Sequence, residues 1–150
     1  MDAPNPIEML LVEDNAYDLE LAMRALQKAN LASVTHVARD GAEALDFIFG
    51  TGVFAGQNML AGLKVVVLDL RLPKVDGLEV VRRLREQAET RLVPVVMLTG
   101  SREQPQIAQA YQLGVTSYVL KPWIFEYYAE VIRDIGLYWL RRNQLPREGK

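Results

Sequence analysis

The sequence predicts a doubly wound α/β fold, in which one parallel sheet lies between two layers of helices. Short apolar runs alternate along the whole chain with segments that have helical periodicity. The run Val65–Leu68 is apolar and β-branched nearly throughout, which is typical of a strand that is buried on both faces. The chain has 150 residues, half of them hydrophobic, which suits one domain of this class.

Five strands and five helices are expected in alternation. The strands are predicted at 7–12, 33–38, 65–68, 93–99 and 115–120. Helical spacing of apolar residues marks segments at 19–26, 44–48, 78–85, 107–113 and 123–143. Asp14 or Asn15 can cap the first helix, Asp76-Gly77 can open the third, and Gly114 can end the fourth. A long glycine-rich loop, 50–62, precedes the central strand.

The composition excludes several classes of function. The formal net charge is −2 and the pI is about 5.5, which argues against a basic face for nucleic acid. The chain has no cysteine, which excludes disulfides and thiolate chemistry. The first residues lack the apolar core of a signal peptide, and no apolar run is long enough to span a membrane. We therefore expect a soluble, cytoplasmic protein that binds neither membrane nor nucleic acid.

Polar residues stand where four of the predicted strands end. They are Glu13-Asp14, Asp69, Thr99 and Lys121. Because the carboxyl ends of parallel strands share one edge of the sheet, these groups should converge. The carboxylates would repel one another unless a cation lay among them, and oxygen donors without His or Cys suit Mg²⁺. Asp69 is then the expected nucleophile toward a phosphoryl group, with Thr99 and Lys121 holding phosphoryl oxygens.

These residues together give the chain a clear resemblance to a response regulator receiver domain. The resemblance is carried by Glu13-Asp14, by Asp69 with Pro73 and Gly77, by Thr99, and by Tyr118 with Lys121-Pro122. It covers nearly the whole chain and implies a single receiver domain over 1–150, with its core at about 7–143. It also implies a flavodoxin-like sheet with the strand order 2-1-3-4-5, and a sensor histidine kinase as the phosphoryl donor.

The resemblance further implies a role for each matching residue. Asp69 would be the phosphoacceptor, and Asp14 and Asp69 would bind Mg²⁺ together with the main-chain carbonyl of Arg71. Glu13 would act on the metal through a water molecule. Thr99 and Tyr118 would form the switch pair, and the Lys121–Pro122 bond would be cis. Arg71 and Ser101 occupy positions that tune the lifetime of the phosphoryl group in the family.

A narrower resemblance connects the chain with the single-domain regulators of bacterial phytochrome kinases. It rests on the long loop before the central strand and on an aromatic-rich last helix that ends near Leu145-Pro146. In that helix one apolar stripe should pack on the sheet: Trp123, Tyr128, Ile132, Ile135 and Trp139. A second stripe remains and predicts a homodimer interface: Ile124, Tyr127, Val131 and Tyr138. Output should then be through contacts with an unidentified downstream protein.

Other interpretations of the same residues stay open. Each acid could be a plain helix cap, and Tyr118 could be packing alone. A phosphatase of the haloacid dehalogenase type uses similar groups, but it needs a second acid two residues after the nucleophile, where this chain has Arg71. A scaffold that is never phosphorylated is the third possibility. His36, the only histidine, is expected to be structural or at the surface. The protein is expected to be a switch rather than a turnover enzyme.

Overall fold

The computed structural model describes residues 6–146, so residues 1–5 and 147–150 of the short tails expected outside the core lie beyond it. Five parallel strands form a single sheet in the order β2-β1-β3-β4-β5. They are β1 (Met9–Val12), β2 (Thr35–Ala38), β3 (Val65–Leu68), β4 (Val95–Thr99) and β5 (Ser117–Leu120). The predicted doubly wound fold and its strand order are therefore confirmed.

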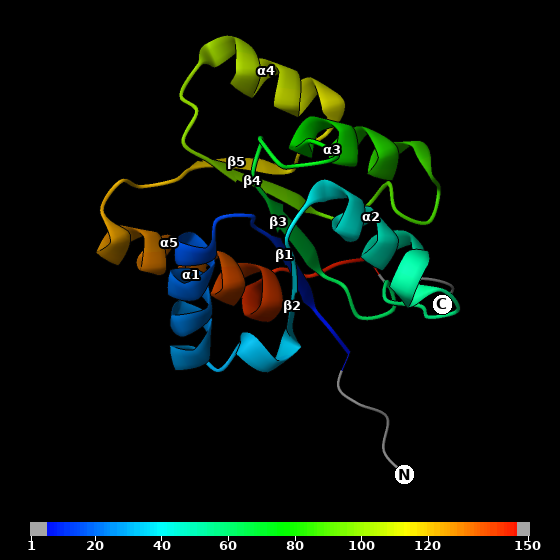
Figure 1. Ribbon diagram of the computed structural model, residues 1–150, viewed down its shortest axis with the longest axis horizontal. Helices are drawn as coiled ribbons and strands as arrows, with labels where there is room; N and C mark the ends of the chain where they lie inside the picture. Colours follow the sequence, from blue (N-terminus) through cyan, green and yellow to red (C-terminus); the bar gives the residue numbers. More distant parts are fainter. Residues whose placement is uncertain (1–5, 147–150) are drawn as a thin grey trace.

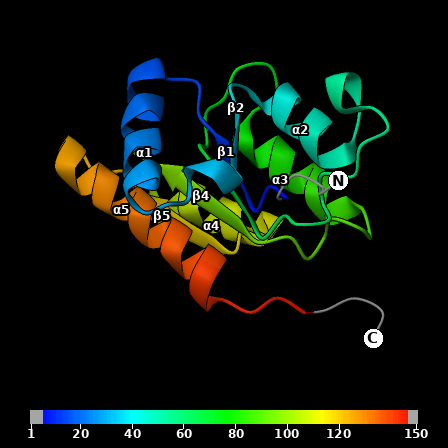
Figure 2. The same cartoon turned by 90° about the horizontal axis from the view of Figure 1, so that it is seen from below.

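The helices cover both faces of this sheet (Figure 1). Helices α1 (Ala16–Lys28) and α5 (Phe125–Leu137) lie side by side on one face. Helices α2 (Gly41–Phe49), α3 (Gly77–Glu86) and α4 (Gln104–Leu113) cover the other face. Figure 2 shows the same two layers from below. Two apolar clusters result, one on each side of the central strands.

Local sequence explains where the helices begin and end. Asn15 caps α1, because its side-chain oxygen accepts a hydrogen bond from the amide of Asp18 at 2.9 Å. Asp76 caps α3 in the same way, and α4 ends at Gly114 in a left-handed conformation with φ of 111°. The loop between α2 and β3 contains a short 3₁₀ turn at Gly52–Phe54.

The last helix differs from its prediction. It starts at Phe125, later than the expected Trp123, and continues after Leu137 as a π-helical turn at Tyr138–Arg142. Trp123 was expected to pack on the sheet, and this prediction is wrong, since the residue precedes the helix and is 91% exposed. The other members of that stripe are buried or half-buried against α1 and the sheet.

The Lys121–Pro122 bond also departs from expectation. It is trans, and no cis peptide bond occurs in residues 6–146. The trans form is the intrinsically favoured one even before proline. In the described part of the chain, no helix combines the length and the apolar character that crossing a bilayer would require.

Candidate functional site

The register of the sheet brings the polar residues together at one edge. Val12 of β1 pairs with Leu68 of β3, so Glu13 and Asp69 leave neighbouring strands at the same level. Thr99 of β4 pairs with Leu120 of β5, and the amide of Lys121 donates to the carbonyl of Thr99 at 2.8 Å. These residues therefore meet because four parallel strands end at the same edge of the sheet, with Thr99 and Leu120 two residues beyond the level of Val12 and Leu68.

The ammonium of Lys121 is the centre of this group. Its Nζ lies 2.8 Å from Glu13 Oε1 and 3.5 Å from Asp69 Oδ2. The side chains of Lys121 and Asp69 are 16% and 19% exposed, whereas that of Glu13 is only 4% exposed. The structure thus joins the predicted acceptor to the predicted lysine in a half-buried ion pair.

Burial and charge act in opposite directions on the ionisable groups here. Burial raises the pKa of Glu13, and the hydrogen bond from Lys121 opposes this only in part. Burial alone would lower the pKa of Lys121, but the hydrogen bond to Glu13 and the charge of that carboxylate outweigh it, so the pKa is raised. Lys121 consequently stays charged at any physiological pH.

Asp18 is a site residue that the sequence analysis missed. Its Oδ2 lies 3.2 Å from the Nζ of Lys121, closer than the nearest oxygen of Asp69. No sequence signal marked it, because Asp18 lies in the first turn of α1 and meets Lys121 only through packing between distant elements. Tyr128 of α5 completes the surroundings, with its ring centroid 5.6 Å from the same Nζ.

Thr99 and Tyr118 are linked through a residue between their strands. The hydroxyl of Thr99 accepts a hydrogen bond from the amide of Ser101 at 3.4 Å, and its side chain is buried. The hydroxyl of Tyr118 donates to the carbonyl of Ser101 at 2.9 Å. Both hydroxyls of the predicted switch pair are therefore held by the main chain of one residue.

Asp14 and Arg71 lie at the outer rim of the site. Asp14 is exposed after β1, and its carbonyl accepts a hydrogen bond from Arg39 at 3.2 Å. Arg71 is exposed and its amide donates to Asp69 Oδ1 at 3.4 Å. Within residues 6–146, no three acidic or histidine side chains stand close enough to form a ready-made metal cluster.

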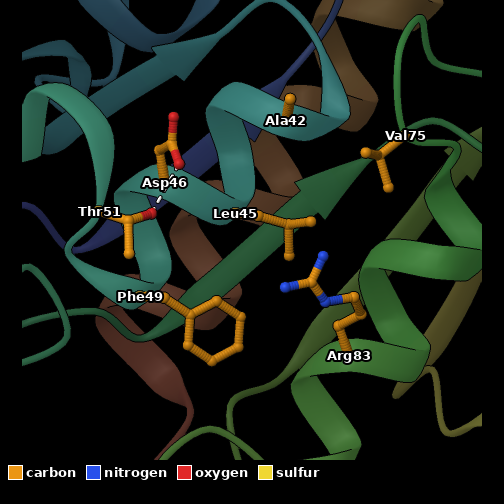
Figure 3. Close-up of a pocket in the computed structure, with 7 residues that line it drawn as sticks. All are labelled: Ala42, Leu45, Asp46, Phe49, Thr51, Val75 and Arg83. Carbon is orange, nitrogen blue, oxygen red and sulfur yellow. Dashed lines mark hydrogen bonds between the residues drawn. The ribbon is translucent and has the colours of Figure 1, made fainter.

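A separate hollow of about 190 Å³ lies between α2 and α3 (Figure 3). Its residues include Asp46, whose carboxylate accepts a hydrogen bond from the hydroxyl of Thr51, and Arg83 on the opposite wall. None of the residues that line it belongs to the strand-end group. His36 lies elsewhere, stacked on Phe47 at 4.6 Å between ring centroids, which agrees with the structural role expected for it.

Two curated proteins match this chain over nearly its whole length. The chain is 37% identical over 147 residues to the probable methanogenesis regulatory protein FilR2 of Methanothrix harundinacea, with 97% of this chain and 92% of that protein covered. It is 30% identical over 146 residues to response regulator Rcp1 of a Synechocystis strain, with 97% of both chains covered.

Solved structures with the same fold include phytochrome-associated regulators. The Mn²⁺-bound form of Rcp1 matches with a TM-score of 0.84 at 29% identity, over 95% of this chain and all of that one. The phosphorylated cyanobacterial phytochrome regulator RcpA matches with a TM-score of 0.83, at 29% identity over 95% of this chain and all of that one. The bacteriophytochrome regulator AtBRR is 45% identical, with a TM-score of 0.67 over 94% of this chain and all of that one.

The family model of the response regulator receiver domain matches residues 9–133. That segment runs from the first residue of β1 into α5 and contains every strand of the sheet. The strand order, the polar groups at the strand ends and this match agree, and the chain belongs to the response regulator receiver family.

Proposed function

We propose that the protein is a phosphorylation switch that accepts a phosphoryl group on Asp69 from the phosphohistidine of a sensor histidine kinase. The ion pair between Asp69 and Lys121 is the observation that carries the proposal. It places a half-buried nucleophilic carboxylate beside a fixed positive charge, as transfer of an anionic group requires. The protein would then be a switch and not a turnover enzyme.

The transfer itself needs little from the protein beyond positioning. An oxygen of Asp69 attacks phosphorus in line, a P–O bond forms, and the P–N bond to the histidine of the kinase breaks. The freed imidazole takes up a proton, and an aspartyl phosphate remains on Asp69. The ammonium of Lys121 and the hydroxyl of Thr99 are placed to bind oxygens of the transferred group.

The oxygen donors at the rim suit Mg²⁺, which binds proteins through only one or two carboxylates and keeps several waters. Asp14 and Asp69 would hold the ion, with the carbonyl of Arg71 as a further ligand and Glu13 acting through water. Glu13, Asp18 and Asp69 carry three negative charges against one on Lys121, so the site has an excess of negative charge. The ion would supply the charge neutralisation that lets two anions approach.

The bonds at Ser101 suggest how the phosphoryl group would be sensed. If the hydroxyl of Thr99 turns toward a phosphoryl oxygen, its hydrogen bond with the amide of Ser101 is lost. The carbonyl of Ser101 is the acceptor for Tyr118, so the position of that ring depends on the same loop. The equilibrium between two conformations of the surface formed by α4 and β5 would then shift toward the one that binds a partner.

A bacteriophytochrome is the kinase class that we propose as donor. The support is the likeness to AtBRR and RcpA, together with the long loop between α2 and β3. The downstream partner would be a protein that reads the shifted surface.

The exposed side of α5 is the interface that we propose for a homodimer. Ile124, Tyr127 and Tyr138 are each more than half exposed there. A groove of about 310 Å³ runs between α5 and β5, and β5 is an edge strand whose outer hydrogen-bonding groups face away from the sheet. A second copy would cover both features at once, because a two-fold axis presents the same patch on each subunit.

Labelling with a small-molecule phosphodonor tests the phosphoacceptor. Wild type with Mg²⁺ should gain one phosphoryl group by intact mass, and Asp69→Asn should gain none. Asp76→Asn is the matched control, because Asn also caps helices and Asp76 lies in the same loop between β3 and α3. Labelling of Asp69→Asn at the same level as wild type would refute the assignment. Steady release of phosphate from aryl phosphates would instead favour a phosphatase.

Light scattering at micromolar concentration tests the dimer. Wild type should have twice the monomer mass, and Tyr138→Glu should be monomeric. Tyr111→Glu on α4 introduces the same charge at another exposed tyrosine and should leave the dimer intact. Wild type that is monomeric both with and without a phosphoryl analogue would contradict the proposed interface.

A further inference from the structure

The ammonium of Lys121 has one carboxylate neighbour that the proposed phosphotransfer does not use. Asp18 Oδ2 lies 3.2 Å from Nζ, between the distances of 2.8 Å to Glu13 and 3.5 Å to Asp69. An ammonium has three hydrogens to donate, and here three carboxylates share them. Every donor of Lys121 is therefore engaged before any phosphoryl group arrives.

The position of Asp18 follows from the start of α1. Asn15 caps the helix by accepting a hydrogen bond from the amide of Asp18, which fixes the first turn. Helix α1 lies against α5 on the same face of the sheet (Figure 1). The ring of Tyr128 on α5 faces the ammonium from this side. Asp18 and Tyr128 therefore hold the end of Lys121 on the α1–α5 side of the site.

The three carboxylates differ in how easily they can give up the ammonium. Glu13 is buried, with a side chain only 4% exposed, so losing its countercharge would be costly. Asp18 is 30% exposed and can exchange the ammonium for water. A phosphoryl group on Asp69 needs the ammonium more than the bare carboxylate does, since it carries more negative charge. Asp18 is the partner that Lys121 can release to meet it.

We propose that Asp18 is a positioning residue that holds the Lys121 ammonium back from Asp69 and so weakens retention of a phosphoryl group. This inference rests on the function proposed above. Asp18 competes for the same ammonium, and the free energy of its ion pair is lost whenever Lys121 turns fully to the phosphoryl group. The competition favours the unphosphorylated state and shortens the life of the phosphorylated one.

The affinity for beryllofluoride at saturating Mg²⁺ measures this competition, because beryllofluoride is a mimic of a phosphoryl group on Asp69. Asp18→Asn keeps the size and polarity of the side chain and removes its charge. It should bind beryllofluoride about twofold to fivefold more tightly, as expected for the loss of one partly exposed ion pair. Its aspartyl phosphate should also be lost more slowly, by a similar factor.

Two comparisons separate this effect from others. Glu20→Gln removes a charge from an exposed position on the same helix, where the carboxylate pairs with Arg24, and should change the affinity little. In a Lys121→Met background, Asp18→Asn should not change the affinity for beryllofluoride, since the ammonium for which Asp18 competes is absent. If Asp18 had a purely structural role, Asp18→Asn would weaken beryllofluoride binding. It would also do so in the Lys121→Met background.

The outcomes distinguish this inference from the proposed function. If wild type binds no beryllofluoride with Mg²⁺, the phosphoacceptor assignment fails. If wild type binds it and Asp18→Asn binds equally well or less tightly, only the role of Asp18 is overturned. Weaker Mg²⁺ binding by Asp18→Asn, measured without beryllofluoride, would assign Asp18 to the metal instead.

Discussion

Tyr128 presents its ring to the ammonium of Lys121 at 5.6 Å, although the two residues come from different elements of the fold. The ring is an attractive neighbour for a cation, particularly where water is excluded. Its hydroxyl, however, is buried and has no hydrogen-bond partner among the described residues. The residue is 3% exposed, and burial raises its pKa. The ring of Tyr128 therefore contacts the ammonium of Lys121, whereas its hydroxyl makes no hydrogen bond with the described residues.

Tyr128→Phe should therefore stabilise the protein. The substitution keeps the ring beside Lys121 and removes a buried donor whose desolvation costs about 1 kcal/mol or more. We expect the free energy of unfolding in urea to rise by about 1 kcal/mol. Tyr127→Phe, at the exposed neighbouring position, should change it by less than about 0.5 kcal/mol. A loss of stability in Tyr128→Phe would mean that the hydroxyl is bonded in solution.

Gly77 should tolerate no side chain, because it packs against the main chain of Asp69. A Cβ at this position would lie 2.2 Å from the carbonyl oxygen of Asp69. Gly77→Ala should cost about 1–3 kcal/mol of stability and slow phosphorylation by displacing Asp69. Gly100→Ala is the control, since a Cβ there meets nothing within 4 Å. Equal stability and labelling rates for the two variants would show that the loop after β3 can move aside.

Arg85 should not be replaceable by lysine. Its guanidinium donates to four main-chain carbonyls, including that of Gly114 at the end of α4 and that of Val93 before β4. Lysine lacks this fork of donors, so Arg85→Lys should lower the free energy of unfolding by about 2 kcal/mol. Arg83→Lys on the exposed side of α3 should change it by less than about 0.5 kcal/mol. Equal losses of unfolding free energy in Arg85→Lys and Arg83→Lys would contradict a specific role for Arg85.

His36 should make stability depend on pH. Burial lowers its pKa below the usual 6.5, and the charge of Glu43 opposes this only in part. The unfolded chain therefore binds the proton first, and the stability present above about pH 6.5 is lost as the pH falls toward the folded pKa. His36→Phe keeps the aromatic contacts and cannot titrate. Between about pH 7.5 and 5.5, the free energy of unfolding of His36→Phe should fall less than that of wild type. Parallel curves of unfolding free energy against pH would refute this expectation.

The strands and the residues that end them were predictable because their signals are local. A fully apolar run such as Val65–Leu68 marks a central parallel strand, and the polar residue after each run marks the edge where the ends meet. The capping acids and Gly114 marked the helix ends for the same reason. Family resemblance supplied the strand order and the roles of the site residues.

The features that the sequence analysis missed depend on packing between elements. Asp18 at the start of α1 meets Lys121, which follows β5, only through packing between elements far apart in the sequence, and no local pattern states which elements are neighbours. Trp123 matched a helical stripe by its spacing, but α5 starts two residues later. Helical spacing therefore does not predict which way Trp123 points, and the residue is exposed. Ser101 connects Thr99 with Tyr118 through its main-chain amide and carbonyl. Every residue type except proline has both groups, so the sequence does not indicate this contact.

The pairing of Glu13 with Lys121 spans 108 positions of the chain, and this has a consequence during synthesis. A nascent chain that has emerged only as far as α4 already carries Glu13 and Asp69 but still lacks Lys121. The ion pairs of Glu13 and Asp69 with Lys121 cannot form in such an incomplete copy. Only a molecule whose last strand has docked onto β4 therefore contains the complete group of charged residues at the strand ends.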